Sequence, residues 1–120
     1  MAYTFLSICS GVAGLELGIK TAVDDSRVLG YIERDAFAAS VLLARMEDAS
    51  LEPAPIYCGD IEKCDFTPFA GQVDCIVAGF PCQPFSVAGA KRGIEDERFI
   101  FDHITRAICE TGCQRVFLEN

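Results

Sequence analysis

Short apolar segments alternate along this chain with segments in which apolar residues recur at helical spacing. Five segments have the composition of β-strands: residues 3–8, 28–32, 56–58, 74–78 and 115–118. Three others carry apolar residues three and four positions apart, the period of an α-helix: residues 15–23, 36–46 and 100–108. Strands that alternate with helices favour parallel pairing through right-handed crossovers. The sequence therefore predicts an α/β fold built on a parallel sheet.

Composition narrows the class of protein further. Hydrophobic residues make up 51% of the 120 residues, which is too many for a disordered chain. No apolar run approaches the roughly 18 residues of a membrane span, and no basic residue precedes Lys20 to start a secretory signal. The seven cysteines include no Cys-x-x-Cys pair, which predicts free thiols and no metal site. We therefore expect a single soluble domain in the cytoplasm.

The charge balance, taken alone, disfavours a nucleic-acid partner. Eighteen acidic and ten basic side chains give a net charge of −8, and an acidic surface repels phosphates. A nucleic-acid function therefore needs evidence from particular residues.

Small, acidic or reactive residues follow every predicted strand. Ligands of open parallel sheets bind beyond the carboxyl ends of the strands, so these residues form the candidate site. They are residues 10–14, Glu33, Asp60, residues 79–83 and Glu119 with Asn120.

The first three strand ends suggest a nucleoside cofactor. Residues 10–14 are small, so a ligand can approach the backbone at the start of the next helix. Glu33 follows Gly11 by 22 positions, about where a doubly wound fold places a carboxylate on ribose hydroxyls. Asp60 is a candidate acceptor for an adenine amino group. The alternatives are an ordinary turn with a solvated Glu33, and a capping role for Asp60.

Two missing motifs limit the kind of cofactor. The full Gly-x-Gly-x-x-Gly pattern is absent, which disfavours a nicotinamide oxidoreductase. Lys20 comes too late for a phosphate-binding Walker lysine. Acidic residues around the site favour a nucleoside with a positively charged sulfonium or amine tail over a phosphate-rich ligand.

A cysteine between two prolines lies just beyond the fourth predicted strand, in the sequence GFPCQPFS of residues 79–86. The prolines keep Cys82 out of a helix or a central strand, so its thiol is available at the sheet edge as a nucleophile. An inert thiol in a proline turn is one alternative. A Cys–His hydrolase is another, although the single histidine, His103, has no evident partner. Residues 79–93 lack periodicity and predict a mobile loop.

These motifs occur in the same order in DNA (cytosine-5)-methyltransferases, and the chain resembles the N-terminal part of their catalytic domain. Residues 9–15, CSGVAGL, correspond to the family's first motif, usually Phe-x-Gly-x-Gly-Gly. Glu33 and residues 59–61 match its second-strand and third-strand motifs. Residues 79–86 match the nucleophile motif almost letter for letter, and Glu119 with Asn120 begins the Glu-Asn-Val motif. The combination of Pro-Cys-Gln and a later Glu-Asn is specific for this family.

The resemblance implies a Rossmann-like S-adenosylmethionine-dependent methyltransferase fold, with helices on both faces of a mostly parallel sheet that is truncated after about the fifth strand. It also implies which residues contact the cofactor S-adenosyl-L-methionine. They are Cys9, Ser10, Gly11, Gly14, Leu15, Glu33, Arg34, Asp60, Ile61, Gly79 and Pro81.

The implied reaction is methyl transfer to C5 of a cytosine flipped out of double-stranded DNA. In that reaction the thiolate of Cys82 adds to C6 of the base, and Glu119 binds or protonates N3. Three residues are implied to lie near the DNA: Gln83, Ser86 and Arg98. An RNA cytosine-5 methyltransferase is an alternative, although its commonest signature has proline where Phe80 stands.

Some features of the family are changed or missing here. Cys9 replaces a phenylalanine that packs on adenine, and Ala13 replaces a glycine. The target-recognition region has no counterpart in residues 1–120. We therefore expect this chain alone to be inactive and aggregation-prone, and a complementary C-terminal chain to be a partner. An inactive nucleotide-binding fragment remains an alternative, and so do restriction–modification, phage and regulatory roles.

Overall fold

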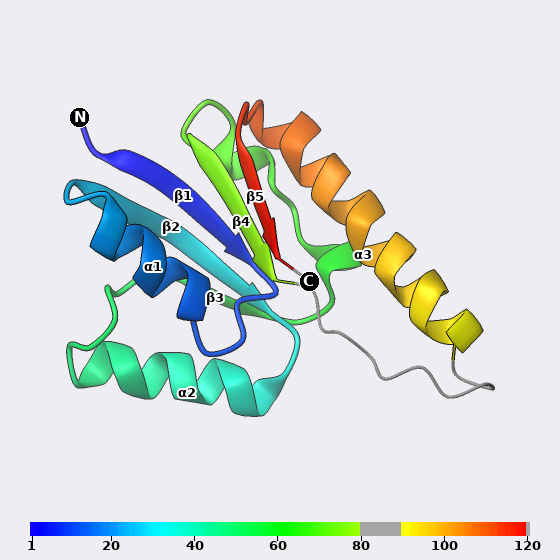
Figure 1. The fold of residues 1–120 in the computed structure, drawn as a ribbon, viewed down its shortest axis with the longest axis horizontal. Coiled ribbons are helices and arrows are strands. Elements are labelled where there is room, and N and C mark those ends of the chain that lie inside the picture. The colour runs from blue at the N-terminus through cyan, green and yellow to red at the C-terminus, as the bar shows by residue number, and fades with distance from the viewer. Residues whose placement is uncertain (80–89, 120) are drawn as a thin grey trace.

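The computed structural model describes residues 1–79 and 90–119, and residues 90–98 by their backbone alone. Five strands form one sheet in the order β3-β2-β1-β4-β5, and every neighbouring pair is parallel (Figure 1). The strands are β1 (Tyr3–Ile8), β2 (Ser26–Glu33), β3 (Ile56–Cys58), β4 (Cys75–Gly79) and β5 (Val116–Glu119). The strand order reverses between β1 and β4, as in doubly wound sheets. The predicted parallel α/β fold is confirmed.

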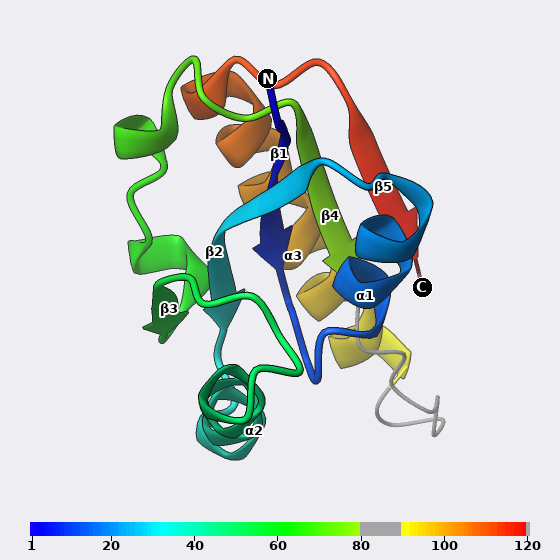
Figure 2. The same ribbon diagram turned by 90° about the vertical axis from the view of Figure 1, so that its left-hand side faces the viewer.

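Helices cover both faces of the sheet. Helices α1 (Gly14–Ala22) and α2 (Ala36–Glu47) lie on one face, and α3 (Ala90–Thr111) lies on the other (Figure 1, Figure 2). Alternate residues of each strand enter two separate apolar cores, since successive side chains point to opposite faces. Phe5 packs on the α1–α2 side, whereas Leu6 packs on the α3 side.

Strand β4, which lies between β1 and β5, is buried on both faces, as its unbroken apolar sequence predicts. Residues 75–78 are all buried, and Ile76 and Val77 have no exposed surface. The strand carries the chain from the interior directly to Gly79 at the carboxyl edge. Whatever follows Gly79 therefore starts from a rigid position.

The expected loop over residues 79–93 is wrong at both ends. Gly79 is the last residue of β4, and α3 already begins at Ala90. Residues 91–98 are rich in Lys, Arg and Glu, which are strong helix formers and outweigh Gly93. The mobility predicted for the segment falls on residues 80–89, outside the described residues.

The apolar face predicted for α1 is also partly wrong. Gly18, Ala22 and Val23 are exposed, whereas Glu16 is the buried residue of this helix. The inner face of α1 is centred on Glu16 because its carboxylate accepts a hydrogen bond from the buried hydroxyl of Ser7 in β1. In the predicted helical segment 100–108 of α3, Ile100, Ile104, Ala107 and Ile108 pack toward the core, but Phe101 is 51% exposed.

The sequence analysis did not predict two short 3₁₀ turns in the connection from β3 to β4. They are η1 (Ile61–Lys63) and η2 (Thr67–Phe69). Arg106 of α3 fixes this connection by donating hydrogen bonds to the carbonyl of Ile61 at 2.8 Å and the carbonyl of Cys64 at 2.9 Å. Its guanidinium also lies 4.9 Å from the ring centre of Phe66. In the described part of the chain, no helix is both long enough and apolar enough to cross a membrane.

Candidate active site

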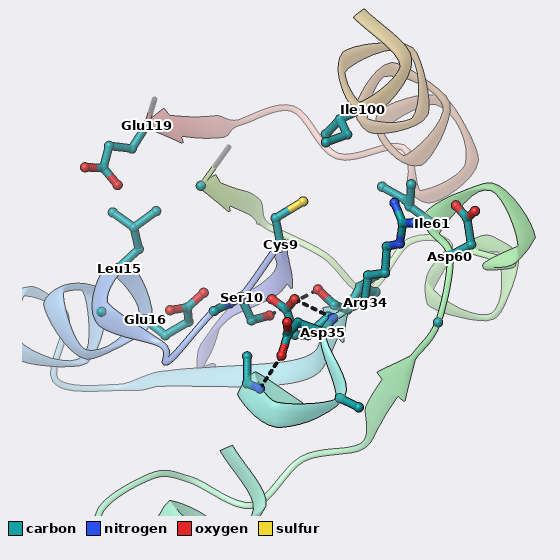
Figure 3. Close-up of a pocket in the computed structure, with 18 of the residues that line it drawn as sticks. Cys9, Ser10, Leu15, Glu16, Arg34, Asp35, Asp60, Ile61, Ile100 and Glu119 are labelled. Carbon is teal, nitrogen blue, oxygen red and sulfur yellow. Dashed lines mark hydrogen bonds between the residues drawn. The ribbon is translucent and has the colours of Figure 1, made fainter. Parts of the chain in front are cut away.

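A pocket of about 940 Å³ opens at the carboxyl edge of the sheet, where the strand order reverses (Figure 3). Its volume suits a nucleoside-sized ligand. Its lining includes every cofactor residue expected from the sequence that the structure describes, together with Glu119. These residues are Cys9, Ser10, Gly11, Gly14, Leu15, Glu33, Arg34, Asp60, Ile61 and Gly79. Pro81 lies outside the described residues.

The turn between β1 and α1 has an unusual backbone. Cys9, Gly11 and Ala13 all have positive φ angles, of 54°, 55° and 65°. Such angles suit glycine and strain other residues. A glycine in place of Ala13 would adopt this conformation without strain. The alternating left-handed residues curl the turn so that its backbone borders the pocket.

Glu33 closes this turn from the end of β2. One carboxylate oxygen accepts a hydrogen bond from the amide of Gly11 at 2.6 Å, and the other accepts from the amide of Asp35 at 2.9 Å. An ionised carboxylate can accept about four hydrogen bonds, so two positions remain. Glu33 is therefore held in place by the backbone, rather than freely solvated, and it still has acceptors for a pair of hydroxyls.

Asp60 borders the pocket on the side away from Glu119 (Figure 3). One of its oxygens accepts from the amide of Glu62 at 3.1 Å and caps η1, so the capping alternative is observed. Asp60 also lines the pocket, together with Ile61. Because Arg106 holds the carbonyl of Ile61, this wall of the pocket is fixed to α3.

Glu119 and Gly79 are paired in the register of β5 and β4. A Cβ atom placed on Gly79 would lie 3.9 Å from a carboxylate oxygen of Glu119 and 3.6 Å from a methyl group of Leu15. Glu119 thus reaches over the end of β4, next to the residue from which the chain enters residues 80–89. The carboxylate is at the edge of the pocket, beside Leu15 (Figure 3).

The thiol of Cys9 lies inside the pocket but is not activated. Burial raises the pKa of Cys9 to about 11, and the negative charge of Glu33 contributes to the increase. A thiol with this pKa is protonated at neutral pH and is a weak nucleophile. Cys9 therefore acts as a small apolar wall of the pocket.

The structure does not test the other expected site residues. Cys82, Gln83 and Ser86 lie outside the described residues. Arg98 belongs to α3, where only the backbone is described up to residue 98. Their roles remain predictions from the sequence.

Several pocket residues were missed by the sequence interpretation: Glu16, Ile32, Asp35, Ala36, Ala38, Gly59, Phe99 and Ile100. Phe99 and Ile100 belong to a helix whose apolar spacing signalled only a core face. Asp35 caps the start of α2, where its side chain accepts from the amide of Ala38 at 2.8 Å. Glu16 carried no signal, because an acid in the first turn of a helix is usually an exposed partner of the helix dipole.

No metal centre is found among the side chains that the structure describes, those of residues 1–79 and 99–119. In that part of the chain, no three His, Cys, Asp or Glu side chains come close enough together to hold an ion.

Known proteins resemble this chain in sequence and in fold. The sequence profile described as C-5 cytosine-specific DNA methylase matches residues 3–120. The type II methyltransferase M.PspPI of Psychrobacter sp. (strain TA137) is 36% identical over 121 residues, which cover 99% of this chain and 27% of that protein. M.Eco47II, the type II methyltransferase of Escherichia coli, is 35% identical over 119 residues, covering 98% of this chain and 27% of that protein. The chain thus spans about a quarter of the length of these relatives.

The fold also occurs in solved structures. A candidate S-adenosyl-L-methionine-dependent methyltransferase from Methanococcus maripaludis superposes with a TM-score of 0.60 at 21% identity. The match covers 98% of this chain and 48% of that protein. At this level of identity the match concerns the fold alone.

Proposed function

Because this chain belongs to the C-5 cytosine-specific DNA methylase family, we propose that it forms the cofactor-binding and nucleophile part of a DNA (cytosine-5)-methyltransferase. The reaction is transfer of a methyl group from S-adenosyl-L-methionine to C5 of cytosine in double-stranded DNA. Residues 1–120 correspond to the N-terminal part of the catalytic domain. Target recognition belongs to sequence outside these residues, or to a complementary C-terminal chain.

The observation that carries this proposal is that one pocket contains both an acid suited to bind the ribose of a cofactor and an acid placed near the expected nucleophile. Glu33 is fixed by backbone amides at one side, and the carboxylate of Glu119 lies beside Gly79 at the other. Glu33 suits the hydroxyls of a ribose. Glu119 lies beside Gly79, from which the chain continues toward Cys82. A cofactor end and a reaction end on the same sheet edge are what a group-transfer site requires.

The residues present fit S-adenosyl-L-methionine. Glu33 has free acceptor positions for the ribose hydroxyls, and Asp60 and Ile61 border the adenine end. The acidic lining complements the positive charge of a sulfonium and would repel a phosphate-rich ligand. When bound, this cofactor supplies an electrophilic methyl group.

The chain's own groups supply the remaining chemistry in this proposal. The thiolate of Cys82 adds to C6 of the flipped cytosine, which makes C5 nucleophilic. Glu119 hydrogen-bonds or protonates N3 and thereby absorbs the charge that the addition moves into the ring. Loss of the C5 proton after methylation expels Cys82. Gln83, Ser86 and Arg98 contact the DNA or the flipped nucleotide.

DNA is favoured over RNA as the substrate. The family is described as a DNA methylase, and both relatives are named type II methyltransferases. These names support a restriction–modification role, and the bacterial origin of both relatives supports an activity in the cytoplasm.

Covalent trapping tests the reaction. DNA containing 5-fluorocytosine stalls after methylation, because fluorine at C5 cannot leave as a proton, so the nucleophile stays bonded to C6. The experiment uses this chain, and this chain fused to the part of M.PspPI that it does not cover, with labelled S-adenosyl-L-methionine. We expect a labelled adduct in the fusion that Cys82→Ser abolishes and that Cys109→Ser, at an exposed thiol outside the pocket lining, retains. An adduct that survives Cys82→Ser would refute the assignment of the nucleophile.

Calorimetry tests the cofactor separately. We expect S-adenosylhomocysteine to bind to the purified chain and NAD to bind more weakly. Tighter binding of NAD would instead indicate an oxidoreductase, the alternative that the missing glycine motif disfavours.

A further inference from the structure

Glu16 is a buried acid in the wall of the pocket. Its side chain is 2% exposed, although glutamate is among the residues least often buried. One carboxylate oxygen accepts from the hydroxyl of Ser7, and the other oxygen, Oε2, has no hydrogen-bond partner among the residues that the structure describes. Glu16 lines the pocket together with Leu15 and Ser10 (Figure 3). An unsatisfied oxygen of a buried carboxylate destabilises the fold unless something binds there.

Among the side chains that the structure describes, those of residues 1–79 and 99–119, none places a compensating positive charge beside Glu16. None of the salt bridges in that part of the chain includes Glu16. Within the same residues, the charged group that acts on Glu16 is Glu33, which has the same sign, and the other titratable neighbour is the phenol of Tyr31. Burial raises the pKa of Glu16, and Glu33 adds to the increase. The site thus favours a ligand that carries a positive charge and hydrogen-bond donors.

The order of the strands indicates which part of a ligand reaches Glu16. Asp60 follows β3, Glu33 ends β2, and Glu119 faces Gly79 at the end of β4. Glu16 belongs to α1, whose first turn follows β1 between the ribose acid and Gly79. A nucleoside whose ribose lies on Glu33 and whose reactive end approaches Gly79 must pass its tail along this helix turn.

We propose that Glu16 binds the α-ammonium group of the cofactor's amino-acid tail through its unpartnered carboxylate oxygen. This inference rests on the proposed function, since it takes the tail from an S-adenosylmethionine-type cofactor. Ser7 orients the carboxylate, and Ser7 is itself fixed by a 2.7 Å hydrogen bond between its hydroxyl and that of Ser10. Glu16 is thus a specificity residue that distinguishes a nucleoside with an amino-acid tail from a bare nucleoside.

The test compares two ligands that share the nucleoside and differ in the tail. S-adenosylhomocysteine carries the ammonium group, and 5′-methylthioadenosine lacks the whole amino-acid tail. Calorimetry measures both ligands on the wild-type chain, Glu16→Gln and Glu33→Gln. Glu16→Gln should weaken S-adenosylhomocysteine by roughly 10- to 100-fold, the value of a charged hydrogen bond, and leave 5′-methylthioadenosine within about twofold. Glu33→Gln should weaken both ligands equally, because both carry the ribose.

A second measurement needs no variant. An analogue of S-adenosylhomocysteine that keeps the carboxylate but lacks the amino group should bind the wild-type chain at least tenfold more weakly than the parent. Equal affinity of the two ligands would overturn the inference, and so would a Glu16→Gln variant that weakens both nucleosides equally or neither. If the wild-type chain binds 5′-methylthioadenosine but the tail adds nothing, the inference fails and the proposed cofactor class survives. If the fusion to the part of M.PspPI that this chain does not cover binds neither nucleoside, the proposed function fails together with the inference.

Discussion

The amide of Gly11 lies 2.6 Å from a carboxylate oxygen of Glu33, which joins the turn after β1 to the end of β2. The residue proposed to hold the ribose is therefore also the residue that fixes the shape of the turn. Ligand binding and local stability both depend on this one contact.

Replacing Glu33 with alanine should lower the free energy of unfolding as well as ligand affinity. The amides of Gly11 and Asp35 lose their acceptor, and a hydrogen bond to a charged group contributes about 1.5–3 kcal/mol. Urea denaturation should show this loss. Glu47→Ala, at an exposed position, is the matched control and should stay within about 0.5 kcal/mol of wild type. Unchanged stability of Glu33→Ala would mean that the turn is held by other contacts.

Two glycines with equally open surroundings should respond to alanine in opposite directions. Nothing lies within 4 Å of a Cβ atom placed on either Gly11 or Gly18. The effect of alanine on stability therefore depends on the backbone conformation alone. Gly11 has a φ of +55°, and alanine there should destabilise the fold by about 1–2 kcal/mol. Gly18 lies inside α1, where alanine should stabilise by about 0.5–1 kcal/mol. Thermal melts of the two variants provide the comparison, and shifts of the same sign would contradict this account.

Arg106 should not tolerate lysine. Its guanidinium donates to the carbonyls of Ile61 and Cys64 and pairs with Glu110 at 3.0 Å. A lysine cannot reproduce this forked geometry, so we expect a loss of about 1–3 kcal/mol in urea denaturation. Arg45→Lys is the control because the Arg45–Asp48 ion pair is exposed and should contribute less than about 1 kcal/mol. Equal effects of the two substitutions would refute a special role for Arg106.

Glu16→Gln should gain stability relative to wild type as the pH rises. Burial raises the folded-state pKa of Glu16, with a further increase from Glu33 and an opposing effect of the Ser7 hydrogen bond. The folded chain then retains this proton to a higher pH than the unfolded chain. The resulting stabilisation is complete below the unfolded pKa and is lost as the pH passes the raised folded value.

Glutamine does not titrate, so the difference in Tm between Glu16→Gln and wild type should grow as the pH rises above 4.5, the ordinary pKa of a glutamate. Melting curves at one-unit intervals measure it. A constant difference in Tm across these pH values would show that the pKa of Glu16 is not raised in the folded chain.

Cys9 should resist alkylation at mild pH. With a pKa of about 11, only about one thiol in a thousand is ionised at pH 8. Mass-spectrometric mapping after iodoacetamide treatment should show Cys9 modified far more slowly than Cys58, whose side chain is exposed. Its rate should rise about tenfold per pH unit up to the pKa. Modification of both thiols at the same rate would contradict the raised pKa of Cys9.

The elements of the fold are predictable because their signals are local. The unbroken apolar sequence of β4 and the helical spacing of α3 each lie within a few neighbouring residues. The strand ends follow from these elements, and so does the pocket, because a parallel sheet brings its carboxyl ends to one edge. The positive φ angles of Cys9 and Ala13 were not predictable, since neither residue type prefers that conformation.

The burial of Glu16 could not be predicted from the sequence, for a different reason. Its partner Ser7 belongs to another element, and only packing of α1 on β1 brings the two side chains together. The same holds for Arg106 and Ile61, which are 45 positions apart. Side-chain contacts between elements depend on the relative placement of those elements, which a periodic pattern does not encode.

The pairing of Gly79 with Glu119 has a consequence for how this site can be lost. Successive side chains of a strand point to opposite faces, so a one-residue slip of β5 against β4 would turn the Glu119 carboxylate away from the pocket. The location of this acid is thus set by backbone alignment along the edge of β4. Substitutions in β5 that shift its alignment with β4 would therefore remove the Glu119 carboxylate from the pocket, although every proposed functional side chain would still be present.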